Sequence, residues 1–446
     1  MESSNVTGLL ELAESISRSA MQITKYHLNA HGAVPSFDVP SSQATGHGEG
    51  HPKEPPAIIA ARSELIVAAS QITALTQGPG GFLRSLSYSY HEMTALSVVL
   101  AFNIQEHVPT QGDISFISLS EKAGFDQHRL ERILRLLFVS NIFRESRPSH
   151  VAHSVTSLEL KNNKEMTAFL GHCAFEAFPA ASRLSDSIAQ YPYSQDPHET
   201  GFNIALNTSD PLFTYLSKNP ARFDRFNLGM AGISQAIGRS SQQVIEGYPW
   251  RDLGSAIVID VGGGNGHISI ALARSFPKLN MVVQDLPQAI VGAEEQVPKD
   301  LKERVVFQGH DMFDPQPESE ARVYYLRHVL HDWPDHYAVK ILKNIIPRMK
   351  ANSILLISDS VIPGPGQMGV LDEKFVRYLD LQMMVLHNAR ERTEKNWTEI
   401  FRSTDPRLRL EKVWVKGESM AASTIIEGRL APETNGHTNE TTNGIH

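Results

Sequence analysis

The chain has 446 residues, of which 41% are hydrophobic, and its formal net charge is -8 at pH 7. This length allows two to three domains with a large core, and the acidic balance argues against nucleic acid or an anionic membrane surface as the main partner. Cys173 is the only cysteine, which excludes an intrachain disulfide and a cysteine-based metal site, so we expect a reducing, cytoplasmic compartment.

The N-terminal part is predicted to form two helices separated by a loop. Leu9, Leu12 and Ile16 recur with helical spacing, and a second helix is expected from about Ile58 to Leu75. Residues 29–56 between them are rich in Gly, Pro, Ser and His. The first 17 residues contain no Lys or Arg and no apolar run reaches transmembrane length, so we expect neither secretion nor a membrane span. Two isolated helices need a packing partner, and a second subunit in a homodimer would supply one.

A helix, a turn and a second helix follow. Ser118 and Glu121 have the spacing of a capping box, Gly124 marks the turn, and Asp126 caps the second helix. Residues 142–145 and 151–156 are then predicted to pair as a small wing.

Three arginines share the outer face of the second helix of this pair. They would suit a DNA backbone, but no larger basic patch surrounds them. We therefore interpret them as a solvated face and expect no nucleic-acid partner. They are Arg129, Arg132 and Arg135.

Between Glu165 and Tyr248 the pattern remains helical, with aromatic residues such as Phe175 near its start. Aromatic residues at this spacing are more often core than pocket. From residue 256 to 362 strands alternate with helices, and residues 407–415 and 423–426 suggest two closing strands. This alternation predicts an α/β domain with a doubly wound parallel sheet and an antiparallel edge.

The stretch AIVIDVGGGNGH, residues 256–267, reads as a buried strand followed by a glycine turn and a helix. Glycine lets a backbone approach a nucleoside cofactor closely, although an ordinary strand-to-helix turn has the same appearance. A dinucleotide fingerprint starting at Gly262 would need a third glycine where His267 stands. The glycines instead read G-x-G-x-G directly after Asp260, and they are Gly262, Gly264 and Gly266.

Acidic residues follow the next two predicted strands. Asp285 comes about 20 residues after the glycines, where a carboxylate can accept both ribose hydroxyl protons. Asp311 ends the third strand, where it could bond an adenine amino group while Met312 and Phe313 pack on the ring. A single Asp in such a position is more often a helix cap, but the repetition after successive strands favours cofactor binding.

His331 lies just beyond the fourth strand, at the sheet edge where open α/β folds bind ligands. An imidazole can remove the proton of a phenol, whose pKa is near 10 by analogy with tyrosine. Such a base needs a carboxylate on its second nitrogen. Asp359 at the end of the fifth strand and the later Glu391 are the candidates.

Several of these blocks resemble one enzyme family. AIVIDVGGGNGH is similar to the first motif of S-adenosylmethionine-dependent methyltransferases. LRHVLHDWPD, ISDSVIP and ARERT resemble the catalytic blocks of the cation-independent O-methyltransferases of the plant caffeic acid type. LSEKAGFDQHRLERILRLLFVSNIF looks like the winged-helix dimerisation element of the same plant type. The likeness extends to fungal O-methyltransferases that act on aromatic polyketides and related phenols.

The resemblance implies a Rossmann-like S-adenosylmethionine-dependent methyltransferase domain preceded by a mainly helical winged-helix dimerisation domain. It implies that His331 is the base, oriented by Asp359 and Glu391, and that the acceptor is a small aromatic molecule with a hydroxyl group. The predicted cofactor-binding residues are Asp260, Gly262, Gly264, Asp285, Leu286, Asp311, Met312, Phe313, Arg327 and Trp333. The predicted acceptor-binding residues are Asp332, Phe175, Met384 and Asn388.

The expected organisation is a dimerisation domain at 1–160, a helical connector at 161–248, the methyltransferase domain at 249–430 and a disordered tail at 431–446. Two alternatives stay open on the sequence. In a metal-dependent catechol methyltransferase, Asp311, Asp332 and Asp359 would supply carboxylates for Mg²⁺, although we expect no metal because the HDW block would then lack a purpose. A catalytically silent regulatory or scaffold protein is the second alternative.

Overall fold

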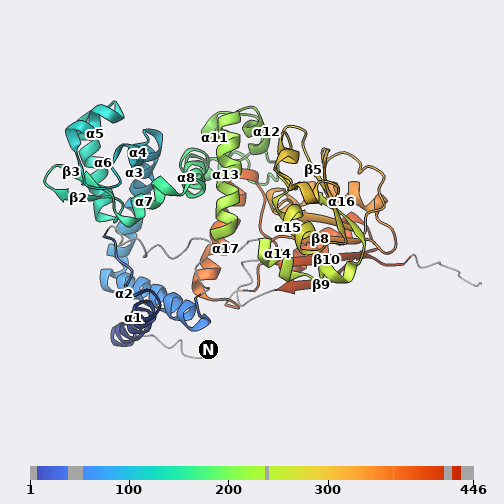
Figure 1. Ribbon diagram of the computed structural model, residues 1–446, viewed down its shortest axis with the longest axis horizontal. Coiled ribbons are helices and arrows are strands. Elements are labelled where there is room, and N and C mark those ends of the chain that lie inside the picture. The colour runs from blue at the N-terminus through green and yellow to red at the C-terminus, as the bar shows by residue number, and fades with distance from the viewer. Residues whose placement is uncertain (1–7, 39–53, 237–240, 365, 416–423, 433–446) are drawn as a thin grey trace, which may run out of the picture. The chain divides into compact units, whose positions relative to one another are not determined.

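The computed structural model describes residues 8–38, 54–236, 241–364, 366–415 and 424–432 (Figure 1). Most of the predicted 29–56 loop and nearly all of the predicted tail lie outside these residues. The chain divides into two compact units, one formed by residues 1–179 and 220–233, the other by residues 180–219 and 234–446. The region expected to be a single connector, 161–248, therefore contributes to both units.

In the first unit, α1 (Leu9–His31) and α2 (Pro56–Tyr88) pack along each other (Figure 1). Leu12, Ile58 and Ala61 are buried, and Arg18 forms an ion pair of 2.7 Å with Glu64. The predicted second helix runs well beyond residue 75, with a kink where Gly78 adopts a φ of 66° before Pro79.

The expectation that this region does not span a membrane stays a prediction. Among the described residues, the helical stretch 56–101 is long and apolar enough to cross a membrane by length and composition, with a mean hydropathy of 1.4 in its most apolar window. Ser, Thr and Gln interrupt the apolar residues of this stretch, so no uninterrupted run shows in the sequence. Helices of proteins that never enter a membrane can also satisfy this criterion of length and composition.

The helix-turn-helix section is present with shifted boundaries. Its first helix begins at Phe116, because extended Ser115 is the N-cap and accepts a hydrogen bond of 3.2 Å from the Ser118 N–H. Ser118 is thus inside the helix and is not its cap. Asp126 caps the second helix as predicted, accepting from the Arg129 N–H at 3.0 Å.

The small sheet has the order β1-β3-β2, all antiparallel. The predicted second strand of the wing is too long, since residues from Val155 onward form a helix capped by Ser154. The elements that complete this unit are α3 (Tyr90–Ala101), α4 (Ile104–His107), β1 (Ile114–Ser115), α5 (Phe116–Ala123), α6 (Gln127–Val139), β2 (Arg144–Arg147), β3 (His150–Ala152), α7 (Val155–Asn162), α8 (Lys164–His172), the π-helix η1 (Cys173–Ala177) and most of α13 (Pro220–Ala236).

The second unit is built on a seven-stranded sheet with the order β6-β5-β4-β7-β8-β10-β9. All neighbours from β6 to β8 are parallel, and β10 pairs antiparallel with both β8 and β9. The predicted doubly wound parallel sheet with an antiparallel edge is therefore confirmed. The strands are β4 (Ala256–Val261), β5 (Leu279–Asp285), β6 (Val305–Gly309), β7 (Val323–Arg327), β8 (Ile354–Ser358), β9 (Leu408–Val415) and β10 (Thr424–Leu430).

Helices cover both faces of this sheet because alternate strand residues are apolar on each side. Val258 and Tyr325 belong to one buried cluster with α14 (Ser241–Gly247) and α15 (His267–Ser275). Ile259 and Leu326 belong to the other, with α16 (Asp335–Ile345) and α18 (Glu394–Thr404). The remaining helices are α9 (Phe178–Ala181), α10 (Leu184–Gln190), α11 (Gly201–Leu206), α12 (Leu212–Ser217) and α17 (Val370–His387), with short 3-10 turns at Trp250–Leu253, Ala293–Gln296, Lys299–Leu301, Leu330–Asp332 and Ile346–Arg348.

The topology fixes where a ligand can bind. The chain moves outward from β4 through β5 to β6, and then returns to the other side of β4 for β7 and β8. A crevice opens outside the carboxyl ends of the strands where the order reverses in this way. The glycine turn follows β4, Asp285 ends β5, and the His331 turn follows β7, so all three lie at this edge.

Candidate active site

The glycine turn has the backbone that only glycine adopts readily. Gly262, Gly264 and Gly266 have φ of 73°, 55° and 74°. A Cβ at Gly262 would lie 2.7 Å from Cγ2 of Val329, so close packing also requires glycine there. The Gly262 N–H donates to the Gln284 carbonyl at 2.8 Å, which fixes the turn to β5. His267 is the first residue of α15.

Asp285 links the end of β5 to this turn. Its Oδ2 accepts from the Gly264 N–H at 2.8 Å and its Oδ1 from the Leu286 N–H at 2.8 Å. Burial raises the pKa of the Asp285 carboxyl above its ordinary value, while the two N–H groups oppose that shift. Both oxygens keep a lone pair for a further donor, as binding of ribose hydroxyls requires.

Asp260 lies beneath the turn. Its buried carboxylate accepts from the Ser269 hydroxyl at 2.6 Å, which ties β4 to α15. Burial raises the pKa of Asp260 to about 6. A Cβ on Gly263 would lie 2.8 Å from its Cγ, so Asp260 supports the turn from below. A direct contact of Asp260 with a cofactor stays a prediction.

The structure also gathers the residues predicted to hold an adenine ring. Oδ1 of Asp311 accepts from the Phe313 N–H at 2.9 Å, and the Met312 carbonyl accepts from Asn344 at 3.2 Å. The rings of Phe313 and Trp333 meet edge to face, with centroids 4.7 Å apart. Aromatic faces of this kind suit a flat heterocycle.

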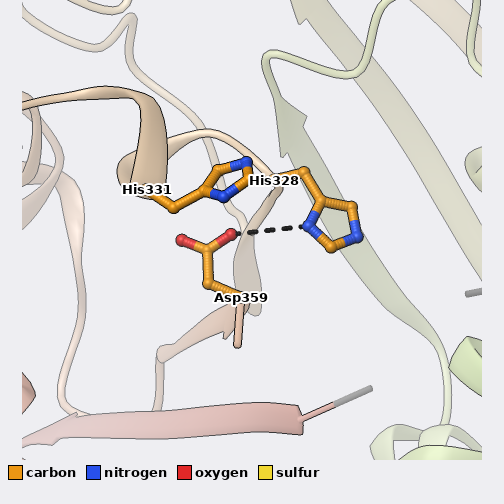
Figure 2. Close-up of side chains that lie close together, drawn as sticks. All are labelled: His328, His331 and Asp359. Carbon is orange, nitrogen blue, oxygen red and sulfur yellow. Dashed lines mark ion pairs between the residues drawn. The ribbon is translucent and has the colours of Figure 1, made fainter. Parts of the chain in front are cut away.

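His331 lies on the short 3-10 turn after β7, and two carboxylates contact its two nitrogens. Nδ1 is 2.9 Å from Oε1 of Glu391, and Nε2 is 3.6 Å from Oδ1 of Asp332. Asp359, at the end of β8, lies between His331 and a second histidine, His328 (Figure 2). The three predicted catalytic residues, separated by up to 60 positions, are thus brought together.

The electrostatics of this cluster favour a positive charge. Burial would lower the pKa of His331, but the carboxylates of Asp332 and Glu391 outweigh it and raise the pKa to about 10. Burial raises the pKa of Asp332 to about 7, against the opposing effect of His331. The side chains of Asp359 and Glu391 are fully buried. Imidazolium formation at His331 is therefore strongly stabilised.

Two histidines of the site were not predicted. His328 has a φ of 51° and its Nδ1 lies 3.8 Å from Oδ1 of Asp359 (Figure 2). Nε2 of the buried His387 lies 3.7 Å from Oδ1 of Asp332. His328 belongs to the LRHVLHDWPD block, so its place in a catalytic motif could have marked it as a site residue. His387 lies outside the quoted motifs.

The donor atoms of His328, His331 and Asp359 lie within 4.8 Å of one another, a set that could hold a metal ion. Nδ1 of His331, however, already bonds Glu391. The metal-dependent alternative also needs Asp311 and Asp332. In the part of the chain that the structure describes, neither belongs to this group.

The predicted acceptor residues have different surroundings. Met384 on α17 is 39% exposed, so its side chain is open to a ligand. Asn388, which ends α17 with a φ of 56°, donates from Nδ2 to the Asp196 carbonyl at 3.1 Å and thereby holds the loop before α11. Phe175 belongs to the first unit, where the Arg225 guanidinium lies 5.2 Å from its ring centre. Their contacts with an acceptor stay predictions.

Together these features define an α/β enzyme that binds a nucleoside-containing cofactor beside a histidine suited to proton transfer. Comparison with known proteins specifies the class. Residues 184–405 match the model of the O-methyltransferase domain family. O-methyltransferase VdtC of Byssochlamys spectabilis is 34% identical over 433 residues, which cover 96% of this chain and all of VdtC. The grayanic acid biosynthesis cluster O-methyltransferase of Cladonia grayi is 34% identical over 381 residues, 85% of this chain and 79% of that protein.

The fold comparison agrees. The crystal structure of OxaC in complex with SAH and oxaline has a TM-score of 0.75 at 23% sequence identity, and the match covers 95% of this chain and 98% of OxaC. At this identity the likeness concerns the fold. On the sequence relationships, the chain belongs to the O-methyltransferase family. It is an S-adenosylmethionine-dependent O-methyltransferase of the kind found in fungal secondary metabolite biosynthesis.

Proposed function

We propose that this enzyme methylates a phenolic hydroxyl of an aromatic secondary metabolite, such as a polyketide, with His331 as the general base. The observation that carries the proposal is the 2.9 Å contact between Nδ1 of His331 and Glu391. A hydrogen on Nδ1 donated to this carboxylate leaves the lone pair on Nε2, the nitrogen that must accept the proton.

The residues around His331 suit this role. As Nε2 takes the proton of the hydroxyl group, positive charge develops on the imidazole. Glu391 stabilises that charge from the Nδ1 side, Asp332 lies 3.6 Å from Nε2, and Asp359 adds a third carboxylate. The oxygen gains nucleophilic character at the same moment, and the remaining contribution of the protein is to align oxygen, methyl carbon and sulfur.

The turn after β4 and the end of β5 fit S-adenosylmethionine. Nothing lies within 4 Å of the place that a Cβ on Gly264 would take, so the backbone is open to a ligand there, and Asp285 offers a carboxylate to the ribose. The cofactor supplies an activated methyl group on a cationic sulfonium, a charge that would also favour the neutral form of a nearby histidine.

Methyl transfer to the proposed acceptors should be insensitive to chelation. Purified enzyme is incubated with labelled S-adenosylmethionine and a panel of phenols, hydroxyxanthones and hydroxyanthraquinones, with and without EDTA. We expect labelled product at equal rates in both, because His331 and its carboxylates supply the proton transfer that a metal would otherwise promote. Loss of product on EDTA treatment, restored by Mg²⁺, would favour the metal-dependent alternative.

We also propose that α1 and α2 form the interface of a homodimer. These helices expose large apolar side chains, including Leu10 at 80%, Met21 at 64% and Leu83 at 63%. Many large apolar side chains exposed on two packed helices are typical of a protein contact. Light scattering should give twice the chain mass of 49.4 kDa. A mass equal to one chain at micromolar concentration would contradict this interface.

A further inference from the structure

We propose that Arg392 is a positioning residue for the base: its guanidinium holds the turn that carries His331 in register with Glu391 and Asp359. The inference deepens the proposed function, since it concerns the alignment of the same histidine. It concerns a residue that contacts neither the expected acceptor nor the expected cofactor and acts only through its neighbours.

The side chain of Arg392 is fully buried and donates to both ends of the His331 turn. Nη1 donates to the Leu330 carbonyl at 2.6 Å and Nη2 to the Trp333 carbonyl at 2.6 Å. These two carbonyls bracket His331 and Asp332, because the 3-10 turn spans Leu330–Asp332. The two bonds fix the direction in which the imidazole leaves the backbone.

A third donor of the same guanidinium fixes the next helix. Nε of Arg392 donates to Oδ1 of Asp335, the first residue of α16, at 2.9 Å. The guanidinium also lies 5.1 Å from the ring centre of the buried Trp397 on α18. Burial lowers the pKa of Arg392 and Asp335 opposes that shift, and the guanidinium stays charged.

The backbone of Arg392 connects the two carboxylates that serve His331. Its carbonyl accepts from the Ile362 N–H at 2.9 Å, three residues beyond Asp359, and Arg392 bridges to Val361 in parallel pairing. Glu391 is the preceding residue. Arg392 therefore holds the turn that carries His331 through its side chain. Through its backbone it holds the segments that carry Asp359 and Glu391.

Lysine cannot replace this arrangement. The three acceptors lie around a planar fork, and an ammonium group presents its donors from a single point. Arg392→Lys keeps the charge but loses at least one of the two carbonyl bonds, which frees the turn. A misplacement of about 1 Å at a reacting group can cost about 10²-fold in rate.

Arg390 provides the matched control. It also pairs with Asp335, but its side chain is 48% exposed and it bonds this carboxylate rather than the carbonyls of Leu330 and Trp333. We expect Arg392→Lys to lower kcat, measured at saturating S-adenosylmethionine, about 10-fold to 100-fold. Arg390→Lys should change kcat less than twofold. Equal kcat values in wild type and Arg392→Lys, or equal losses in both variants, would overturn the proposal.

A second readout needs no acceptor and so separates this proposal from the proposed reaction. In ¹⁵N-histidine-labelled protein with SAH bound, the Nδ1 hydrogen that His331 donates to Glu391 should give a low-field proton resonance, assigned by its loss in His331→Ala. We expect this resonance in wild type and Arg390→Lys, and its loss or upfield shift in Arg392→Lys. An unchanged resonance in Arg392→Lys would refute the role, whatever the acceptor.

Thermal unfolding and SAH binding establish that each variant is folded. Should Arg392→Lys not fold, Asp335→Asn is measured in the same way, because it removes the charged partner of Nε and leaves both carbonyls in place. The proposal expects the His331 resonance to move in Asp335→Asn as well, and an unmoved resonance there would contradict it.

Discussion

Replacing His331 by alanine should lower the rate of methyl transfer by about 10² to 10⁴, the usual contribution of a general base. The affinity for SAH should change less than twofold, because the turn after β4 and Asp285 lie on other strands. Labelled-methyl transfer measures the first quantity and calorimetry the second. His336→Ala, an exposed histidine five residues further along, is the matched control and should keep full activity.

The pH dependence gives an independent check on the same residue. Because the pKa of His331 is raised to about 10 in the protein alone, its base form becomes more populated as pH rises above neutrality. The wild-type kcat/KM should therefore increase with pH and level off near that pKa. His331→Ala should gain rate only as the acceptor phenol itself ionises, so its rate at neutral pH should stay far below wild type. An alanine variant with wild-type activity at neutral pH would remove His331 as the base.

The sequence predicted best those features that depend on local order along the chain. An apolar strand that ends in a polar residue places that residue at the carboxyl edge of a parallel sheet. The sequence therefore predicts His331 at this edge, and the sheet order places it there together with Gly262 and Asp285.

Contacts across the chain between residues that no motif links were not predicted. Arg392 reaches the carbonyls of residues about 60 positions earlier, and nothing in its neighbourhood marks those partners. Asp260 is a second example. Its place directly before the glycines was clear from the sequence, but its position beneath the turn and its hydrogen bond from Ser269 were not. The N-cap of α5 is Ser115 and not Ser118, because Ser115 has the extended backbone from which its hydroxyl accepts the Ser118 N–H. Residue identity alone does not set that backbone conformation.

Replacing Asp285 by alanine should weaken SAH binding about 10-fold to 100-fold. Hydrogen bonds to a charged group are worth about 1.5–3 kcal/mol, and each 1.4 kcal/mol is about tenfold in affinity. The change removes the proposed ribose contact and also releases the Gly264 N–H, which Asp285 holds at 2.8 Å.

Asp285→Asn separates these two effects. The amide oxygen can still accept from Gly264, so the turn should stay in place, while the charged acceptor for the ribose is lost. We expect Asn to bind SAH more weakly than wild type but more tightly than Ala, with calorimetry as the measurement. Asp300→Ala, at an exposed aspartate in the segment that follows β5, is the control and should bind as wild type does. Unchanged affinity in Asp285→Ala would mean that the carboxylate serves only the turn, and the ribose would then have to be held by the backbone at the β5 end.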